Sequence, residues 1–237
     1  MRRERKALVL LSGWLIANFI PHLVVFLATG KIYYQLSTVW MIVAEGSIMF
    51  LNLLLPVFAL RYIFKQTGDM LSNLGWQWKG WRTVWVGFFG ILVLLIIAIG
   101  TQQLIGDPVS TSGQSFASFG ELAMAMVLLL VLTAVAEETM FRGWIQTTLT
   151  QDYGVWLGIG IAALLFGLRH LPMDLYGGFS QQAPPSAWIS RMLQLYVGAV
   201  VFGLVRHRAK STWASWVMHE GFLVLIVFLG IAAMQGQ

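Results

Sequence analysis

Long apolar runs separated by short polar stretches are the main pattern of this 237-residue chain. A helix needs roughly 20 apolar residues to cross about 30 Å of hydrocarbon, and seven stretches approach that length. The pattern therefore predicts an all-α fold, a polytopic bundle of about seven transmembrane helices. The expected spans are residues 8–28, 40–63, 84–105, 121–149, 155–171, 188–205 and 213–234.

The composition excludes a soluble domain. Hydrophobic residues make up 58% of the chain, charged residues only 11%, and the mean hydropathy is +0.74. The eleven tryptophans and six tyrosines suit the two membrane interfaces, where an apolar ring with a polar tip is stable. The lack of cysteine excludes disulfides, cysteine-ligated metals and a thiol nucleophile. We therefore expect one integral membrane domain over residues 1–237.

Basic residues gather on one side of the expected bundle. If seven spans alternate, that side holds Arg2, Arg3, Arg5, Lys6, Arg61, Lys65, Lys79, Arg82, Arg206, Arg208 and Lys210. Cytoplasmic loops carry an excess of Lys and Arg, so the N-terminus is predicted to be cytoplasmic and the C-terminus outside. The net charge of +5 is then a topology signal, and we expect no nucleic-acid partner.

The connections between the spans contain no second domain. Residues 65–82 mix basic residues with tryptophan and leucine, which predicts an amphipathic segment on the inner membrane surface. Residues 106–119 and 173–185 are rich in Gly, Pro, Ser or Thr and are expected to form outer loops.

Two adjacent carboxylates, Glu137 and Glu138, follow the apolar run 122–136. An ionised group at the centre of a membrane helix costs roughly 2.5 to 3.5 kcal/mol, so such residues usually face a polar cavity or a partner. Glu138 and Arg142 are four residues apart and share one helix face. We therefore predict that Arg142 pairs with Glu138 and leaves Glu137 free to act.

Two histidines, His170 and His219, lie in other apolar segments. Histidine exchanges its proton near neutral pH and is the commonest metal ligand, so these residues and the glutamates suffice for a water-activating site. At a rise of about 1.5 Å per residue, Glu137, His219 and His170 lie at different distances, from roughly 10 Å for His219 to roughly 22 Å for His170, from the inner ends of their spans. They can meet only if the helices tilt or the span ends differ from those predicted.

Three short motifs follow one another along the chain, and each carries an ionisable side chain. They are Glu137-Glu138-x-x-x-Arg142, Phe166-x-x-x-His170, and His219 in the last span. In this order and in a membrane setting, residues 121–228 resemble the core of the CPBP or Abi family of intramembrane proteases, which includes CAAX prenyl proteases and bacteriocin-processing enzymes. The resemblance implies an endopeptidase of the cytoplasmic membrane of a prokaryote that cleaves a membrane-associated protein or peptide with an activated water.

The resemblance also implies roles for these residues, with the site among the fourth, fifth and seventh spans. Glu137 is expected to be the general base, His170 to help hold and polarise the water, and His219 to stabilise the oxyanion. Glu138, Arg142 and Phe166 are expected to support them.

One position departs from the family pattern. Leu223 stands where the family usually has asparagine, and leucine cannot donate a hydrogen bond to an oxyanion. Either His219 acts with another donor, such as a protonated Glu220 or a backbone amide near Gly221, or the activity is reduced or differently directed.

Zinc is an alternative to a metal-free site. Glu137, His170 and His219 match the three protein ligands of a catalytic zinc centre, although no His-Glu-x-x-His motif is present. We favour a metal-free mechanism and keep Zn²⁺ as the alternative.

Two other functions fit parts of the sequence. Leu223 motivates a non-catalytic family member that acts as an immunity or assembly factor. Glu45 and Glu137 motivate a membrane transporter with a Glu/His proton relay. The substrate stays open between a prenylated cysteine at a C-terminus, a bacteriocin leader and another membrane-anchored protein.

Overall fold

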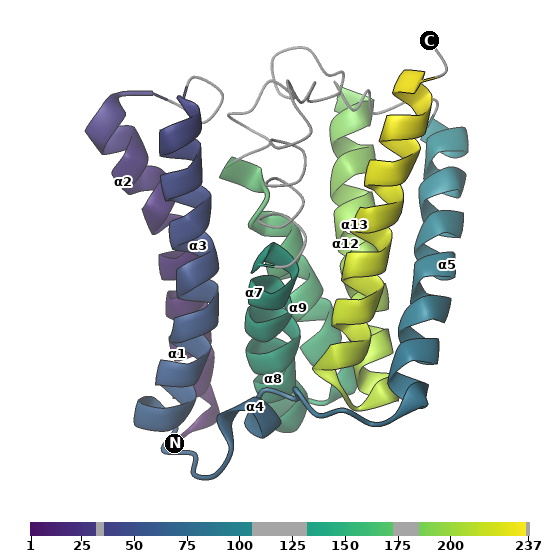
Figure 1. The fold of residues 1–237 in the computed structure, drawn as a ribbon. Helices are drawn as coiled ribbons and strands as arrows, with labels where there is room; N and C mark the ends of the chain where they lie inside the picture. Colours follow the sequence, from purple (N-terminus) through teal and green to yellow (C-terminus); the bar gives the residue numbers. More distant parts are fainter. Residues whose placement is uncertain (32–35, 106–131, 173–184, 236–237) are drawn as a thin grey trace.

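The computed structural model describes residues 1–31, 36–105, 132–172 and 185–235. Over these ranges the chain is helical and contains no strand, which confirms the all-α fold (Figure 1). The expected outer loop 106–119, residues 121–131 of the expected fourth span and residues 173–184 of the second loop lie outside the described residues.

The N-terminal helices form one side of the bundle. The first expected span consists of α1 (Arg3–Asn18) and α2 (Ile20–Thr29), and α3 (Thr38–Phe58) returns beside them and continues as the π-helical turn η2 (Ala59–Ile63). The first span breaks because Pro21 has no backbone N–H to donate to the preceding turn.

Two buried amides join α1 to α3. Asn18 and Asn52 donate to each other across 3.4 and 3.2 Å, and both are 1% exposed. Side-chain hydrogen bonds of this kind hold helices together in lipid, where the hydrophobic effect between helices is lost.

The central layer carries both glutamates. A continuous helical run consists of α7 (Ala134–Glu137), the wider π-helical segment η4 (Glu138–Gln146) and α8 (Thr147–Tyr153). The chain reverses at Gly154, which has φ +90°, and returns as α9 (Val155–Leu168). With 14 residues, α9 is about 21 Å long and ends inside the bundle.

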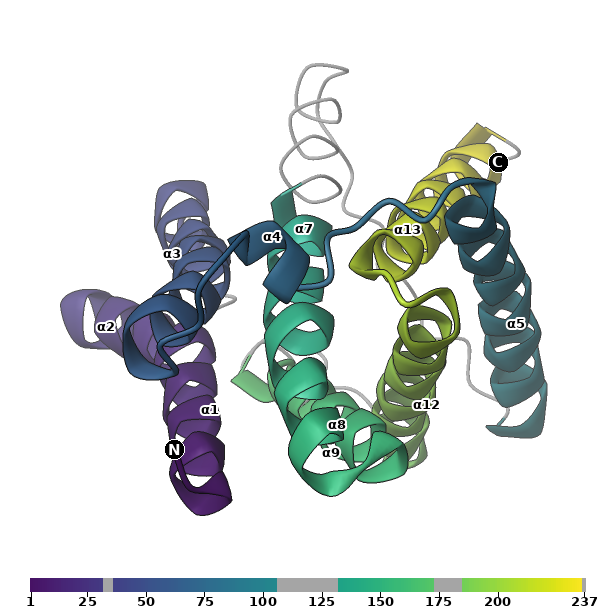
Figure 2. The ribbon, with the colours of Figure 1, turned by 90° about the horizontal axis from the view of Figure 1, so that it is seen from below.

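The other side of the bundle consists of α5 (Trp81–Ile105), α12 (Pro185–Ala209) and α13 (Thr212–Gln235), which Figure 2 shows side by side. Leu94, Phe202 and Met218, one from each helix, belong to a common buried cluster.

Four helices of the described chain are long and apolar enough to cross a membrane: Arg3–Thr29, Ile42–Ile63, Trp81–Gly100 and Trp188–Ala209. The total of seven spans stays a prediction. Large apolar side chains such as Leu27, Phe89 and Ile96 are at least 60% exposed on the outside of these helices. Apolar surface of this extent is costly in water and stable in lipid, so the chain is an integral membrane protein.

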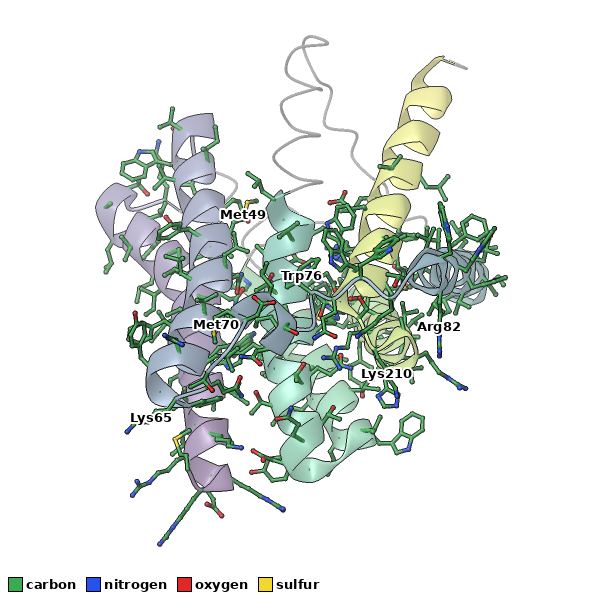
Figure 3. The ribbon with its side chains drawn as sticks, turned by 60° about the horizontal axis from the view of Figure 1, so that its bottom comes forward. Met49, Lys65, Met70, Trp76, Arg82 and Lys210 are labelled. Atoms are coloured by element: carbon green, nitrogen blue, oxygen red, sulfur yellow. The ribbon has the colours of Figure 1, made fainter. Side chains whose placement is uncertain are left out.

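The connection between η2 and α5 crosses under the central helices (Figure 2). Its only helix is the short α4 (Met70–Asn73), capped by the Asp69 carboxylate, which accepts from two backbone N–H groups. Leu71 and Trp78 are exposed, whereas Leu74 is 1% exposed, so the segment has an apolar inner side. Figure 3 shows Trp76 of this segment beside the central run and α13.

Gly75 ties this connection to the start of α13. Its φ of +76° favours glycine, and a Cβ there would lie 2.7 Å from the Thr212 hydroxyl. The Thr212 N–H donates to the Gly75 carbonyl and the Thr212 hydroxyl to the Leu74 carbonyl, both at 2.8 Å. Leu74 in turn lies against Gly143 of η4. The connection therefore fixes the level at which α13 begins.

Candidate active site

The site lies where α7 passes into η4 and brings two carboxylates into the centre of the bundle. Glu137 is 4% exposed and Glu138 is fully buried. A buried carboxylate is stable only when hydrogen bonds and opposite charges replace its water. The partners of the two residues therefore define the site.

Glu138 pairs with Arg142, one turn further along the same helix. The guanidinium lies 3.3 Å from Glu138 Oε1, so the predicted pair is present. The Arg142 guanidinium also lies 4.6 Å from the ring centre of Phe166 and 4.8 Å from that of Phe202, and it donates to the Ala199 carbonyl at 3.4 Å. Two aromatic faces and one carboxylate thus stabilise a fully buried cation.

Glu137 pairs with Arg169, the residue that follows α9. The guanidinium donates to Glu137 Oε1. The prediction that Glu137 is left free to act did not include this ion pair. The reason is tertiary, because the short helix α9 ends at the depth of Glu137 and places its C-terminal arginine against the carboxylate.

His219 of α13 lies between the two glutamates. Its Nδ1 is 3.1 Å from Glu138 Oε1, and its Nε2 is 3.7 Å from Glu137 Oε2. The first distance is a hydrogen bond, in which Nδ1–H donates to the carboxylate. The second is too long for a direct hydrogen bond and suits one bridging water.

His170 lies in the turn after α9. Its Nδ1 is 3.0 Å from the Phe166 carbonyl, which can only accept, so Nδ1 carries the proton and Nε2 of the neutral ring has a lone pair. The Phe166 ring centre is 5.1 Å from that of His170 and 6.4 Å from that of His219. Glu137 and His219 are close to each other, and the Phe166 ring packs against both His219 and His170.

The predicted difference in depth disappears for two reasons. The central run ends at Tyr153, four residues beyond the expected end. Glu137 therefore lies about 6 Å further from the inner end of its helix than predicted. Leu74 contacts both Gly143 of η4 and Thr212, the first residue of α13, so α13 begins at the level of Gly143. Gly143 lies about 15 Å from Tyr153 along the central run. His219 therefore meets Glu137 although it follows the start of α13 by only seven residues.

Arg169 is the site residue that the sequence reasoning missed. A cation inside an apolar segment needs a partner, and this is the signal in the sequence that indicates Arg169. His22 of α2 lies within electrostatic range of both Arg169 and Glu45, so these charges extend the ionic cluster towards α2 and α3.

The residues expected to ligate zinc do not form a metal site in this arrangement. Within the described ranges, no three His, Cys, Asp or Glu side chains lie close enough to hold one ion. Arg169 already binds one oxygen of Glu137, and a second cation there would be repelled.

The sequence profile of one protein family, described as type II CAAX prenyl endopeptidase Rce1-like, matches residues 119–225. The matched stretch holds both glutamates, Arg169, His170 and His219. No curated protein and no solved structure matches the chain.

Loss of the buried Arg142 charge is expected to destabilise the fold. Arg142→Met leaves Glu138 without its cation and should lower the free energy of unfolding by about 3 to 5 kcal/mol, measured by denaturant unfolding in detergent. The control is Lys6→Met, which removes the partly exposed 3.0 Å pair with Asp152 and should cost less than about 1 kcal/mol. Equal losses in the two variants would contradict a dominant role of the buried pair.

Proposed function

We propose that this chain, which carries a type II CAAX prenyl endopeptidase Rce1-like domain over residues 119–225, is an intramembrane endopeptidase that activates water with Glu137 and the site histidines. The observation that carries the proposal is the pairing of Glu137 with His219 across 3.7 Å inside a buried ionic cluster. The family match favours proteolysis over a proton relay, which has no such support. The substrate is a membrane-associated protein or peptide.

Glu137 is the general base. A water that accepts from Nε2–H of doubly protonated His219 and donates to Glu137 Oε2 gives that proton to the carboxylate, and its oxygen forms a bond to the scissile carbonyl carbon. The π electrons of that carbonyl move onto its oxygen and create an oxyanion. When the tetrahedral intermediate collapses, the C–N bond breaks and the proton passes from Glu137 to the amine.

His170 and His219 position this water. The donor at His170 Nδ1 is used by the Phe166 carbonyl, which leaves Nε2 as an acceptor for the second water proton. His219 is fixed by Glu138, and Glu138 is in turn fixed by Arg142. The second carboxylate therefore orients the catalytic imidazole and does not react itself.

Arg169 supplies the oxyanion donor that Leu223 cannot provide. A guanidinium presents five N–H donors in a planar fork, so one Arg can hold a carboxylate and an oxyanion together. Its pairing with Glu137 supports a position next to the attacking water. A preorganised donor of this kind stabilises the transition state by about 2.7 to 4 kcal/mol.

An apolar cavity supports a substrate that carries a lipid chain. The cavity has a volume of about 410 Å³ and lies between α3, the α3–α5 connection and the α7–η4 junction. Val135 and Thr139, which flank the two glutamates in sequence, line it together with Leu53, Leu74 and Trp213. A prenyl group on a C-terminal peptide is the first candidate, in keeping with the description of the matched family.

The basic end of the bundle is the cytoplasmic end in this proposal. Figure 3 shows Lys65 at one edge of that end and Arg82 and Lys210 at the other, and the N-terminus lies at the same end (Figure 1). An excess of Lys and Arg marks cytoplasmic connections. The apolar cavity is bordered by the connection at the same end, so the scissile bond is expected to arrive from the inner half of the bilayer.

Glu137→Gln is expected to abolish cleavage, because an amide cannot accept the water proton. Cleavage of a farnesylated CaaX peptide is measured in proteoliposomes, with the unprenylated peptide as the substrate control. Glu45→Gln, which removes an intramembrane carboxylate outside the motifs, should retain cleavage. If both variants lose proton flux in the same vesicles and the unsubstituted chain cleaves nothing, the relay function replaces the protease.

Arg169→Gln is expected to lower kcat by about 10²- to 10³-fold, with KM changed by only a few-fold. Leu223→Asn in the Arg169→Gln background should restore part of kcat, because an amide donor returns where the family usually has one. Retained kcat in Arg169→Gln, or an equal rise in KM, would limit Arg169 to a structural ion pair.

The proposed mechanism needs no metal. Active, purified protein is therefore expected to contain much less than one zinc per chain by elemental analysis and to keep its activity in excess EDTA. Activity that disappears with the chelator and returns on addition of Zn²⁺ would establish the zinc alternative instead.

A further inference from the structure

A second, polar cavity lies at the basic end of the bundle. It has a volume of about 380 Å³ and is bordered by the α3–α5 connection, the η4–α8 junction and the end of α12. Arg206, His207 and Lys210 line it, and no Asp or Glu is among the described lining residues. The size falls within the range of small-ligand sites. None of the catalytic residues lines this cavity.

Arg206 is the half-buried cation of this cavity. Its guanidinium donates to the Thr147 hydroxyl at 2.7 Å, and that hydroxyl donates to the Arg142 carbonyl at 2.9 Å. Gly75 makes room for it, because a Cβ there would lie 3.0 Å from the guanidinium NH2 nitrogen. The guanidinium is therefore held in place by neutral groups.

One donor of Arg206 has no acceptor among the described residues. Its Nε–H is buried and unpaired, and no carboxylate of the described chain forms an ion pair with the guanidinium. Asp152, which follows the lining residue Gln151 in sequence, is paired with Lys6 at 3.0 Å. A cation without a counter-charge also costs free energy, so an anionic ligand in the cavity that accepts from the guanidinium would stabilise this site.

We propose that this cavity binds a phosphate group at the membrane surface. The planar fork of Arg206 matches phosphate oxygens, and Lys210 adds a second positive charge at the rim. The cavity lies at the end that Lys65, Arg82 and Lys210 share (Figure 3), where the headgroups of anionic lipids concentrate. An anionic phospholipid headgroup and free inorganic phosphate offer the same chemistry.

Binding is tested on the full-length protein in detergent. Native mass spectrometry measures the apparent Kd for phosphatidylglycerol and for phosphatidylcholine, and the midpoint of thermal unfolding is followed with added inorganic phosphate. Arg206→Gln is expected to weaken binding about tenfold or more, since it removes the charge-assisted bonds. Lys210 is exposed, so Lys210→Gln removes a charge of the site without destabilising the fold.

Arg208→Gln is the matched control. Arg208 lies in the same turn and is exposed, and it does not line the cavity; the bond that it accepts from Arg82 uses its backbone carbonyl. If the chain prefers phosphatidylglycerol to phosphatidylcholine, and this preference is lost in the Arg206 and Lys210 variants but kept in Arg208→Gln, the ligand is a lipid headgroup. If only inorganic phosphate raises the midpoint of thermal unfolding, and this effect is lost and kept in the same variants, the ligand is free phosphate.

Equal weakening in Arg208→Gln and the two cavity variants, or no binding of either probe, would overturn the proposal. Because the readout is binding, these outcomes do not depend on whether the chain cleaves a peptide.

Discussion

The burial of Glu137 and Glu138 in an apolar bundle is the constraint on which the rest of the structure depends. Each carboxylate needs a compensating charge, and each cation must itself be brought in at a cost. Arg142 comes from the same helix and is flanked by the rings of Phe166 and Phe202. Arg169 comes from the end of α9. The approach of α9 and α12 to η4 is therefore fixed by electrostatics as well as by packing.

The same constraint makes the two glutamates different. Arg142 and His219 Nδ1 both lie against Oε1 of Glu138, so this carboxylate is held by the fold. Glu137 binds Arg169 through one oxygen and presents the other to His219 at 3.7 Å. In a site that excludes water, hydrogen bonds and charges act more strongly than in solution. The oxygen that faces His219 is thus the natural position for a proton acceptor, and the remaining contacts hold it in place.

Sequence alone predicted what depends on local periodicity. The apolar runs indicated the all-α membrane bundle, and the four-residue spacing indicated the Glu138–Arg142 pair. The Arg169–Glu137 pair and the level of His219 depend on where helices begin and end in three dimensions. Gly75 and Leu74 set the start of α13 through Thr212, and nothing in the local pattern of residues 65–82 indicates that contact. A helix of only 14 residues, α9, likewise places Arg169 at a depth that a full span would not.

Three arginines, of which Arg142 is buried and Arg169 and Arg206 are half-buried, differ in the kind of partner that the fold gives them. Arg142 and Arg169 lie deep in the bundle and are neutralised by carboxylates. Arg206 lies in the last turn of α12 and is held by a hydroxyl and a glycine, which leave its charge uncompensated. An uncompensated cation is tolerated only near water or anionic headgroups, where its field is screened. The position of Arg206 near the end of a span, and the neutral groups around it, are therefore both explained if its counter-charge comes from outside the chain.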